Sequence, residues 1–347
     1  MTDFLIIGAG IIGLLTAREL IKRGATVTLI DKGAVGQEAS WAGGGIISPL
    51  YPWRYSDAIT QLAARSQRLY PELAQALQNE TGIDIELIRS GMIMLDSHDK
   101  IPALAWAKTH QVTLDYLSSH AISALQTDLG IAAEALWMPE VMQVRNPRLL
   151  QALALSLKQN KVDIIEHQAV KQLYREGTRI THVATLDQTL TADNIIITAG
   201  AWSSELLGEL APEIKITPVR GQMLLFNAPE HKLTKMVLYR NHYLIPRRDD
   251  LIIAGSSLEY QSGFNKIPTL EALNELSVSA YTLFPDLRNA TLIAQWAGLR
   301  PYATNGEPAM GLIAPYDNLY INAGHFRNGL VLAPGAVERF CEHYPIL

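Results

Sequence analysis

The sequence has a single cysteine, Cys341. One cysteine excludes an internal disulfide and a cysteine-rich metal site, and it favours a reducing compartment such as the cytoplasm. We interpret Cys341 as a small buried side chain. The nine histidines show no metal-ligand spacing, and none is paired with a plausible nucleophile. The sequence therefore predicts no metal site.

The sequence also lacks an excess of positive charge and a long hydrophobic run. Its formal net charge of −5 gives no reason to expect nucleic acid or an anionic membrane surface as a partner. The apolar stretch from Phe4 to Leu15 is too short to span a bilayer and lacks the flanks of a signal peptide. We expect a soluble protein, and 347 residues with 48% hydrophobic content predict a large core and two domains.

A glycine-rich turn follows the first predicted strand. The strand is Phe4 to Ile7, the turn reads Gly8-Ala9-Gly10-Ile11-Ile12-Gly13, and a helical pattern runs from Ile11 to Arg23. This order is typical of a dinucleotide-binding unit, in which Gly8 permits the turn, Gly10 lets the backbone approach a pyrophosphate and Gly13 lets helix and strand pack. The helix N-terminus adds amide donors and the positive end of a dipole.

Asp31 ends a second predicted strand, Thr26 to Ile30, and lies 18 residues after Gly13. The carboxylate that accepts ribose hydroxyls is expected at roughly 20 residues. For the glycines alone, an ordinary turn is an equally good interpretation. The strand, the helix and Asp31 in register favour a dinucleotide, and these residues leave both FAD and NAD open.

Two further segments indicate ligand contacts. The apolar strand at residues 193–198 ends in Ala199-Gly200, as expected for a buried parallel strand whose carboxyl end faces a ligand. A second glycine segment, Gly324-His325-Phe326-Arg327-Asn328-Gly329, follows a predicted strand at 319–323. The dinucleotide would then be held by residues from both ends of the sequence.

The remaining pattern predicts a discontinuous arrangement. We expect helices at 56–79, 102–110, 146–157 and 270–284, and strands at 91–95, 163–166, 172–175, 181–185, 219–226, 243–246, 251–256 and 292–296. The charged segment 247–250 is interpreted as a solvated hairpin turn, and Arg300 as part of a glycine-bearing turn. The predicted fold is α/β, with a Rossmann-type cofactor domain (1–88, 140–215 and 295–347) and a mostly antiparallel substrate domain (89–139 and 216–294).

These motifs together resemble the D-amino-acid oxidase family of flavoproteins. The resemblance rests on GAGIIG with Asp31, on the segments at 38–45 and 199–202, on Trp296-Ala297-Gly298-Leu299-Arg300-Pro301, and on residues 324–334. Within the family, the last two segments are most similar to the glycine oxidases of thiamine biosynthesis. The resemblance covers nearly the whole chain and implies FAD, bound non-covalently.

The resemblance also implies roles for individual residues. Arg300 would bind a substrate carboxylate, with Arg327 close by and Tyr243 adding a hydrogen bond. The residues expected to contact FAD are Gly8, Gly10, Ile11, Ile12, Gly13, Asp31, Lys32, Ser40, Gly44, Gly45, Ile46, Val170, Gly200, His325, Phe326, Arg327, Asn328, Gly329, Leu330 and Val331.

The chemistry suits these residue types. A planar arginine fork can hold an amino-acid carboxylate and so orient its Cα–H bond toward flavin N5. Hydride transfer would give an imine, and dioxygen would reoxidise the flavin and yield hydrogen peroxide. Taken alone, an arginine such as Arg300 or Arg327 is more often structural than catalytic, and the placement of both in glycine-bearing turns after strands favours a binding role.

Several alternatives remain open at this point. The substrate could be glycine, sarcosine or a small D-amino acid. The enzyme could instead be a dehydrogenase with a different electron acceptor, and a flavin-binding subunit acting through a partner is a third possibility. The resemblance favours a homotetramer.

Overall fold

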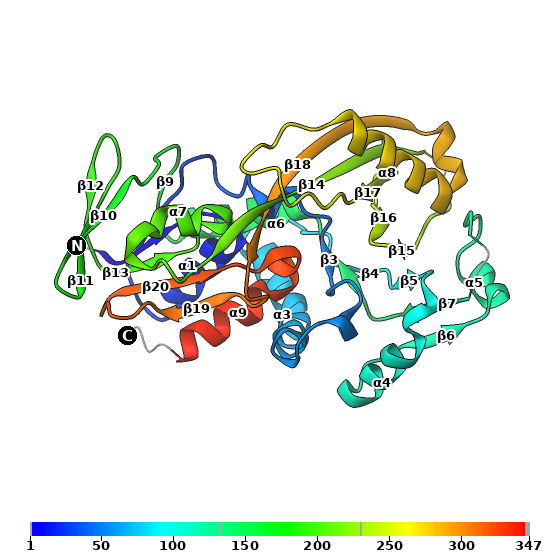
Figure 1. Ribbon diagram of the computed structural model, residues 1–347, viewed down its shortest axis with the longest axis horizontal. Helices are drawn as coiled ribbons and strands as arrows, with labels where there is room; N and C mark the ends of the chain where they lie inside the picture. Colours follow the sequence, from blue (N-terminus) through cyan, green and yellow to red (C-terminus); the bar gives the residue numbers. More distant parts are fainter. Residues whose placement is uncertain (1, 132–133, 230, 344–347) are drawn as a thin grey trace.

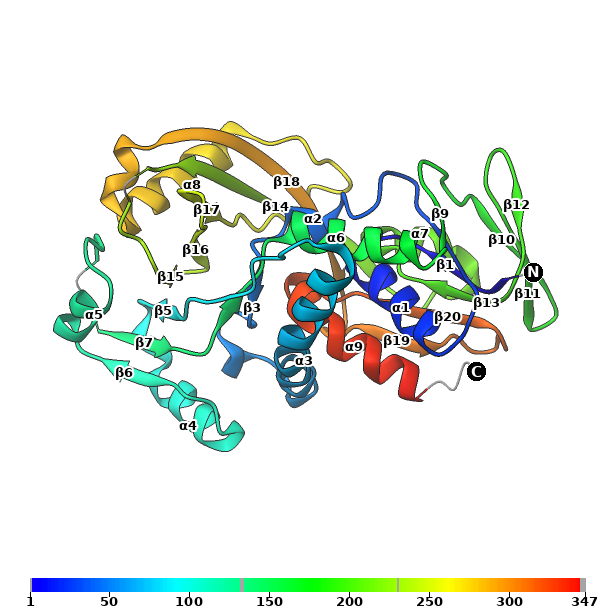
Figure 2. The ribbon, with the colours of Figure 1, turned by 180° about the vertical axis from the view of Figure 1, so that it is seen from behind.

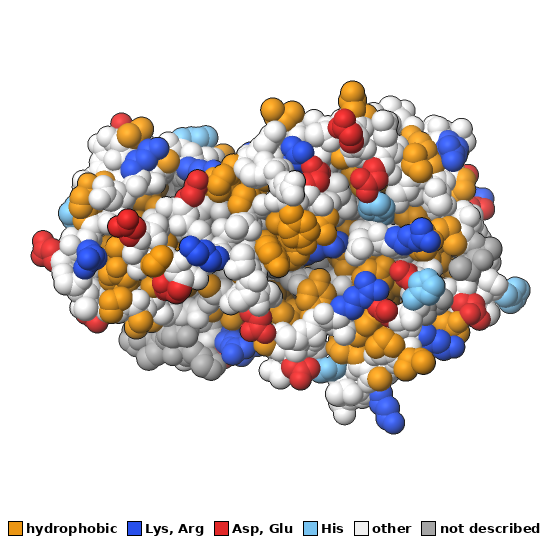
Figure 3. All heavy atoms as spheres, viewed as in Figure 1, with side chains coloured by type: hydrophobic (Ala, Val, Ile, Leu, Met, Phe, Trp, Pro, Cys, Tyr) orange, Lys and Arg blue, Asp and Glu red, His pale blue; other side chains and the backbone are white. Residues whose placement is uncertain are grey.

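The computed structural model describes residues 2–131, 134–229 and 231–343. Two lobes lie side by side along the long axis of the molecule (Figure 1). Two long strands, β14 (Ile216–Asn227) and β18 (Thr291–Ala303), run from the first lobe into the second, as the view from behind also shows (Figure 2). On the face shown in Figure 3, acidic and basic side chains are interspersed, in keeping with the small net charge.

The first lobe contains a six-stranded sheet. Its strands, in spatial order, are β19 (Ala309–Leu312), β20 (Leu319–Ala323), β13 (Ala192–Ile197), β1 (Thr2–Ile7), β2 (Val27–Ile30) and β9 (Asp163–Ile165). All neighbouring pairs are parallel except β19 with β20. The central strands are continuous apolar runs because a parallel sheet is covered on both faces.

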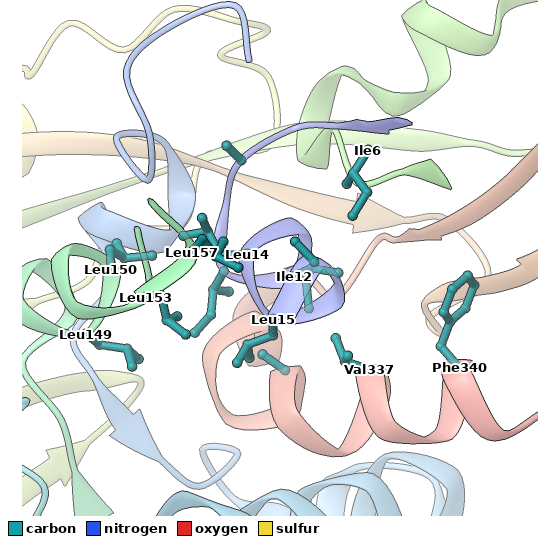
Figure 4. Close-up of a cluster of buried hydrophobic side chains, with 14 of the residues drawn as sticks. Ile6, Ile12, Leu14, Leu15, Leu149, Leu150, Leu153, Leu157, Val337 and Phe340 are labelled. Carbon is teal, nitrogen blue, oxygen red and sulfur yellow. The ribbon is translucent and has the colours of Figure 1, made fainter. Parts of the chain in front are cut away.

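Helices cover the face of this sheet that carries Phe4 and Ile6. They are α1 (Ile11–Lys22), α3 (Asp57–Thr81), α6 (Asn146–Gln159) and α9 (Gly329–His343). Leucines of α1 and α6 meet in the centre of this core, and Val337 and Phe340 close it from α9 (Figure 4). Since α1 is surrounded by other elements, it is apolar on nearly every side.

The opposite face of the sheet carries Leu5 and Ile7. Successive side chains of a strand point to opposite faces, so β1 contributes to both cores. This second core is covered by α7 (Ser203–Leu207) and by a small sheet of β10 (Gln172–Glu176), β11 (Arg179–Ala184) and β12 (Thr189–Leu190).

The second lobe is built on an eight-stranded sheet. Its strands, in spatial order, are β18, β14, β17 (Leu251–Gly255), β16 (His242–Pro246), β15 (Met236–Tyr239), β5 (Met92–Met94), β7 (Ala135–Met138) and β6 (Asp115–Leu117). Only the β15–β5 pair is parallel. The flanking helices are α4 (Lys100–His110), α5 (Ser119–Leu125) and α8 (Leu270–Leu283).

Short elements connect the lobes. They are α2 (Ala39–Ala42) and a three-stranded sheet of β3 (Ile46–Ile47), β8 (Met142–Gln143) and β4 (Ile88–Arg89). Within the described ranges, every helix is too short or too polar to serve as a membrane span.

The predicted fold class is confirmed: a discontinuous α/β unit stands beside a mostly antiparallel sheet. The two sheets draw on the segments assigned to the two domains, although β18 crosses the predicted boundary at residue 295, and the boundaries themselves stay a prediction. One expectation is wrong, because Arg300 lies inside a strand and not in a turn. β18 continues through it because it pairs with β14 along its whole length, with Val219 opposite Arg300.

The segment 247–250 is a hairpin turn, but it is not fully solvated. Arg248, Asp249 and Asp250 are exposed, whereas Arg247 is buried, with 8% of its surface exposed. The turn is closed by a hydrogen bond from the Arg247 N–H to the Leu251 carbonyl, over 2.8 Å. The side chain of Arg247 is directed into the protein, where it finds hydrogen-bond acceptors.

Candidate functional site

A cavity of about 480 Å³ runs between the two lobes. At one end it is lined by the turn that joins β1 to α1 and by Asp31. At the other end it is lined by Tyr243, Arg300 and Arg327, which come from β16, β18 and the short 3-10 helix η6 (Phe326–Asn328). The cavity therefore joins the predicted cofactor and substrate residues.

The turn between β1 and α1 is shaped by close backbone contacts. Gly8 has φ of +113°, and a Cβ atom there would lie 2.5 Å from the carbonyl oxygen of Thr198. A Cβ atom on Gly13 would lie 1.9 Å from the Gly8 oxygen, so a larger residue would push helix and strand apart. Gly10, which lines the cavity, has no side chain that could cap α1, and the Ile11 N–H donates to Ser40 Oγ over 2.9 Å. The next amides at the helix N-terminus are not bonded by a side chain and are available to an anion.

Asp31 organises this end of the cavity. Its Oδ2 accepts a hydrogen bond from the Ala9 N–H over 2.7 Å, and its Oδ1 accepts one from the Gly33 N–H over 2.8 Å. Burial raises the pKa of the carboxyl group, and the two backbone donors oppose that rise. An ionised carboxylate has about four acceptor positions, so these bonds leave capacity for ribose hydroxyls.

Aromatic rings cover the same end. The Lys32 ammonium lies 3.0 Å from the centre of the Trp202 ring, and Trp202 stacks on Phe264 at 5.3 Å between ring centres. Lys266 donates to Glu38 over 2.9 Å. Phe264 and Lys266 were missed by sequence reasoning, because a loop that comes from the other lobe leaves no local pattern.

Asn146 holds the segment at residues 40–46. Its Nδ2 donates to the carbonyl oxygens of Ser40, over 2.8 Å, and Gly43, over 3.1 Å. Ser40 Oγ in turn accepts from the Ile11 N–H over 2.9 Å, which joins this segment to the start of α1. The sequence predicted Asn146 only as the start of a helix, since its partners lie about 100 residues away.

Arg300 is held by backbone and hydroxyl groups. Its Nη2 donates to Ser256 Oγ over 2.8 Å, and its Nη1 donates to the Ser257 carbonyl over 3.1 Å. Burial lowers the pKa of Arg300, and the neighbouring charge of Arg327 lowers it further. The guanidinium passes over Gly221, where a Cβ atom would lie 1.9 Å from Nη1. Sequence reasoning missed Gly221, which faces Gly298 across the sheet.

Glu259, whose charge acts on Arg300, belongs to another ion pair. Glu259 accepts from Arg220 Nε over 2.8 Å and from Gln222 Nε2 over 2.8 Å. Burial works to raise the pKa of Glu259, but hydrogen bonds from Ser257, Gln222 and Arg220 outweigh it and lower the pKa. Within the described residues, the guanidinium of Arg327 has no hydrogen-bond or ion-pair partner. The cavity end at Arg300 and Arg327 therefore attracts an anion.

Three buried polar side chains that line the cavity carry unpaired atoms. They are Asn322, whose two amide atoms are both unpaired, His325, whose Nε2 is unpaired, and Asn146, whose Oδ1 is unpaired. Burial lowers the pKa of His325 to about 4, so the imidazole is neutral at physiological pH. An unpaired buried polar group is costly, which favours a polar ligand here. Asn322 was not predicted from the sequence.

Most predicted site residues meet at this cavity. Those that line it are Gly8, Gly10, Ile11, Ile12, Asp31, Lys32, Ser40, Gly44, Gly45, Ile46, Val170, Gly200, Tyr243, Arg300, His325, Phe326, Arg327, Gly329 and Leu330. Gly13, Asn328 and Val331 are not among the lining residues. Gly13 packs against the β1 end, Val331 lies in the α1 core, and Asn328 is buried with its N–H bonded to the His325 carbonyl. In the described part of the chain, no cluster of three or more His, Cys, Asp or Glu residues could hold a metal ion.

Comparisons with known proteins agree with this geometry. The family model "DAO: FAD dependent oxidoreductase" matches residues 3–342. Glycine oxidase of Pseudomonas aeruginosa is 46% identical over 339 residues, which cover 97% of this chain and 93% of that protein. The crystal structures of glycine oxidase from Bacillus cereus ATCC 14579 and Geobacillus kaustophilus match with TM-scores of 0.92 and 0.90, each at 27% identity. They cover 99% of this chain, and 94% and 95% of theirs. The chain belongs to the DAO family of FAD-dependent oxidoreductases.

Proposed function

We propose that this protein oxidises glycine and other small amino acids, with FAD as cofactor and dioxygen as final electron acceptor. The observation that carries the proposal is the pair Arg300 and Arg327 at one end of the cavity, where Glu259 is already bound to Arg220. Two guanidinium groups without a neutralising carboxylate favour a substrate that brings its own. The similarity to glycine oxidases over nearly the whole chain supports an amino acid.

FAD is the cofactor of this family, and the residues present fit it. The open N-terminus of α1 suits the pyrophosphate, and Asp31 suits the ribose hydroxyls. The unpaired polar atoms of Asn322 and His325 offer hydrogen bonds to a polar ring system. When bound, FAD supplies the two-electron oxidation by accepting a hydride from the substrate.

The chain's own contribution is binding and orientation. Arg300 is fixed by Ser256 and Ser257, so its planar fork can hold a carboxylate in one direction. Fixing the carboxylate also fixes the Cα–H bond, and such orientation accounts for much of catalysis in reactions of this kind. Tyr243 adds a hydroxyl at this end of the cavity. We propose Arg300, Arg327 and Tyr243 as the substrate residues.

No acid or base in the protein is required. His325 is neutral and buried, and Glu259 is tied to Arg220. The amino acid therefore reacts with its amine already neutral. It loses a hydride from Cα and a proton from nitrogen to give an imine, and water then hydrolyses the imine to an oxoacid and ammonia. Dioxygen takes up the two electrons and two protons as hydrogen peroxide.

The walls at this end favour a small substrate. Tyr243 Oη lies 3.4 Å from Met223 Sδ, and a Cβ atom at Gly255 would lie 2.3 Å from that sulfur. Two bulky side chains packed so closely restrict the space beside Arg300. Glycine, sarcosine and small D-amino acids fit this restriction. Supply of thiazole biosynthesis, a cytoplasmic location and a homotetramer are further parts of the proposal.

A substrate panel tests the function. Under anaerobic conditions, glycine should bleach the flavin absorbance of the purified holoprotein, whereas large L-amino acids should not. In air, oxygen uptake should equal hydrogen peroxide release. Failure of every small amino acid to bleach the flavin would overturn the substrate class. Bleaching without oxygen uptake would replace the oxidase with a dehydrogenase.

A further inference from the structure

Arg247 is a buried cation bound only to neutral groups. Its Nη1 donates to Gln143 Oε1 over 2.8 Å and to the Val144 carbonyl over 3.0 Å, and its Nη2 donates to the Gly44 carbonyl over 2.8 Å. Burial lowers its pKa to about 10, so it is still charged at neutral pH. Burying a charge without a counter-ion is costly. The hydrogen bonds of the Arg247 guanidinium offset part of this cost, and their acceptors indicate what the residue does.

The contact with Gly44 belongs to a series. The carbonyl of Gly43 accepts from Asn146 Nδ2 over 3.1 Å, that of Gly44 accepts from Arg247, and that of Gly45 accepts from the Val144 N–H over 2.8 Å. Three successive carbonyls are thus bound by the protein. Gly43, Gly44 and Gly45 all line the cavity.

These contacts also fix the direction of the amide groups. The peptide bonds here are trans, and a trans peptide carries its C=O and N–H on opposite sides. The N–H groups of Gly44, Gly45 and Ile46 are therefore turned away from Asn146, Arg247 and Val144. This segment can present amide donors to a ligand only while its carbonyls stay bound.

Strand β16 links the segment to the substrate end. Tyr243, Ile245 and Arg247 alternate along the chain and so share one face. A Cβ atom at Gly44 would lie 2.8 Å from Ile245 Cδ1 and 3.2 Å from Tyr243 Oη, while Arg247 binds the Gly44 carbonyl. Two side chains of β16 and that of Arg247, which directly follows the strand, thus lie around Gly44, and one of them is the proposed substrate residue Tyr243.

We propose that Arg247 is a positioning residue for the cofactor. By holding the Gly44 carbonyl, it directs the amide donors of residues 44–46 toward the flavin, and it thereby fixes the position of the flavin relative to Tyr243. The inference depends on FAD binding alone and goes beyond the proposed function. Its test uses no amino-acid substrate, so the two can fail separately.

The test compares Arg247→Met with Arg248→Met. Each change removes one positive charge, and the two arginines are adjacent in the sequence. Arg247 is buried, whereas Arg248 is exposed and bonds to Asp84 at the surface. The first readout is the Kd of FAD, measured by quenching of flavin fluorescence on titration into the apoprotein. The second is the midpoint potential of the bound flavin. A purely structural role would change melting temperature without changing the potential.

Arg247→Met should raise the Kd of FAD at least tenfold. It should also shift the potential to more negative values, because misdirected amides no longer stabilise negative charge on the reduced flavin. Arg248→Met should leave the Kd of FAD within twofold of the parent's value and the midpoint potential close to the parent's. Arg247→Lys, which keeps the charge but not the fork, should be intermediate and provides the measurement if Arg247→Met does not fold. Parental Kd and potential in whichever Arg247 variant folds would overturn the proposal.

Discussion

The carboxylate of Asp31, which directly follows β2, accepts a hydrogen bond from the backbone N–H of Ala9 in the glycine-rich turn, over 2.7 Å. Its second oxygen accepts from Gly33, over 2.8 Å. One side chain thus joins the loop after β1 to the loop after β2 while it borders the cavity. The residue has a structural task in addition to the ribose contact expected from its position.

Asp31→Asn should weaken FAD binding. The amide keeps the size but loses the charge that strengthens hydrogen bonds from the ribose hydroxyls, and its single acceptor oxygen leaves one of the backbone donors of Ala9 and Gly33 without a partner. Hydrogen bonds to charged groups contribute about 1.5–3 kcal/mol, which corresponds to roughly a tenfold or greater rise in Kd. Fluorescence quenching gives the Kd, and circular dichroism of the apoprotein checks the fold. Parental affinity would contradict the role given to Asp31.

Arg300→Lys should impair turnover as well as substrate binding. Lysine keeps the charge but lets the carboxylate pivot, and loss of orientation alone can cost ~10²-fold in rate. Arg300→Ala should lose more, because the substrate carboxylate then enters the cavity without this partner. Both variants should still bind FAD. Stopped-flow bleaching of the flavin by glycine without oxygen measures the effect, and a parental rate and affinity in Arg300→Ala would remove Arg300 from the substrate site.

Gly221→Ala perturbs Arg300 without removing it. The new Cβ atom would lie 1.9 Å from Arg300 Nη1, and the flexible arginine is the group that must move. We expect KM for glycine to rise at least tenfold, while the Kd of FAD changes less than twofold. Gly263→Ala is a suitable control, because a Cβ atom meets nothing within 4 Å there, although its φ of +54° adds a small backbone strain. Unchanged KM in Gly221→Ala would mean that Arg300 need not occupy this position.

Cys341 should give stability a specific dependence on pH. Burial raises the pKa of the thiol to about 12, against about 8.5 in an unfolded chain. The neutral, buried thiol therefore makes its full contribution to the free energy of unfolding below pH 8.5. This contribution is lost as the pH rises toward 12, by about 1.4 kcal/mol per pH unit. Urea unfolding at pH 8 and pH 10 should show this loss in the parent and a smaller loss in Cys341→Ala. Equal losses in both proteins would contradict the prediction.

FAD should be released by acid precipitation. A covalent link of the kind made by a cysteine needs that cysteine beside the flavin, whereas Cys341 lies in α9 within the hydrophobic core and does not line the cavity. All yellow colour should appear in the supernatant. Flavin retained on the pellet would contradict non-covalent binding, and mass spectrometry of the supernatant identifies the flavin.

The sequence predicts the parts of the site that are specified by residues close together in the chain. Strand, turn and helix at residues 2–22 formed as expected, because apolar runs and glycine spacing specify them over short distances. It did not predict that Arg247 is buried, since the neighbouring Arg248, Asp249 and Asp250 give the segment a polar pattern. The acceptors that stabilise Arg247 lie about 100 and 200 residues away.

Dependence on residues distant in the sequence also explains why the turn predicted at Arg300 is wrong and why Asn146 was not predicted as a site residue. Gly298 and Pro301, close to Arg300 in the sequence, indicate a turn, but pairing of β18 with β14 overrides that local preference. The hydrogen bonds of Asn146 to Ser40 and Gly43 depend on tertiary contacts alone. Family resemblance, not periodicity, supplied the substrate residues.

The strand order β20-β13-β1 has a consequence for biosynthesis. Strand β1 can pair with β2 early in synthesis, but its other neighbour, β13, starts 190 residues later, at Ala192 opposite Thr2. The cavity still lacks Asn322, His325 and Arg327 until residues 319–330 have been made. Contacts so distant in sequence form slowly. We therefore expect the complete flavin site to form only at the end of synthesis, so that incorporation of the cofactor is a late maturation step.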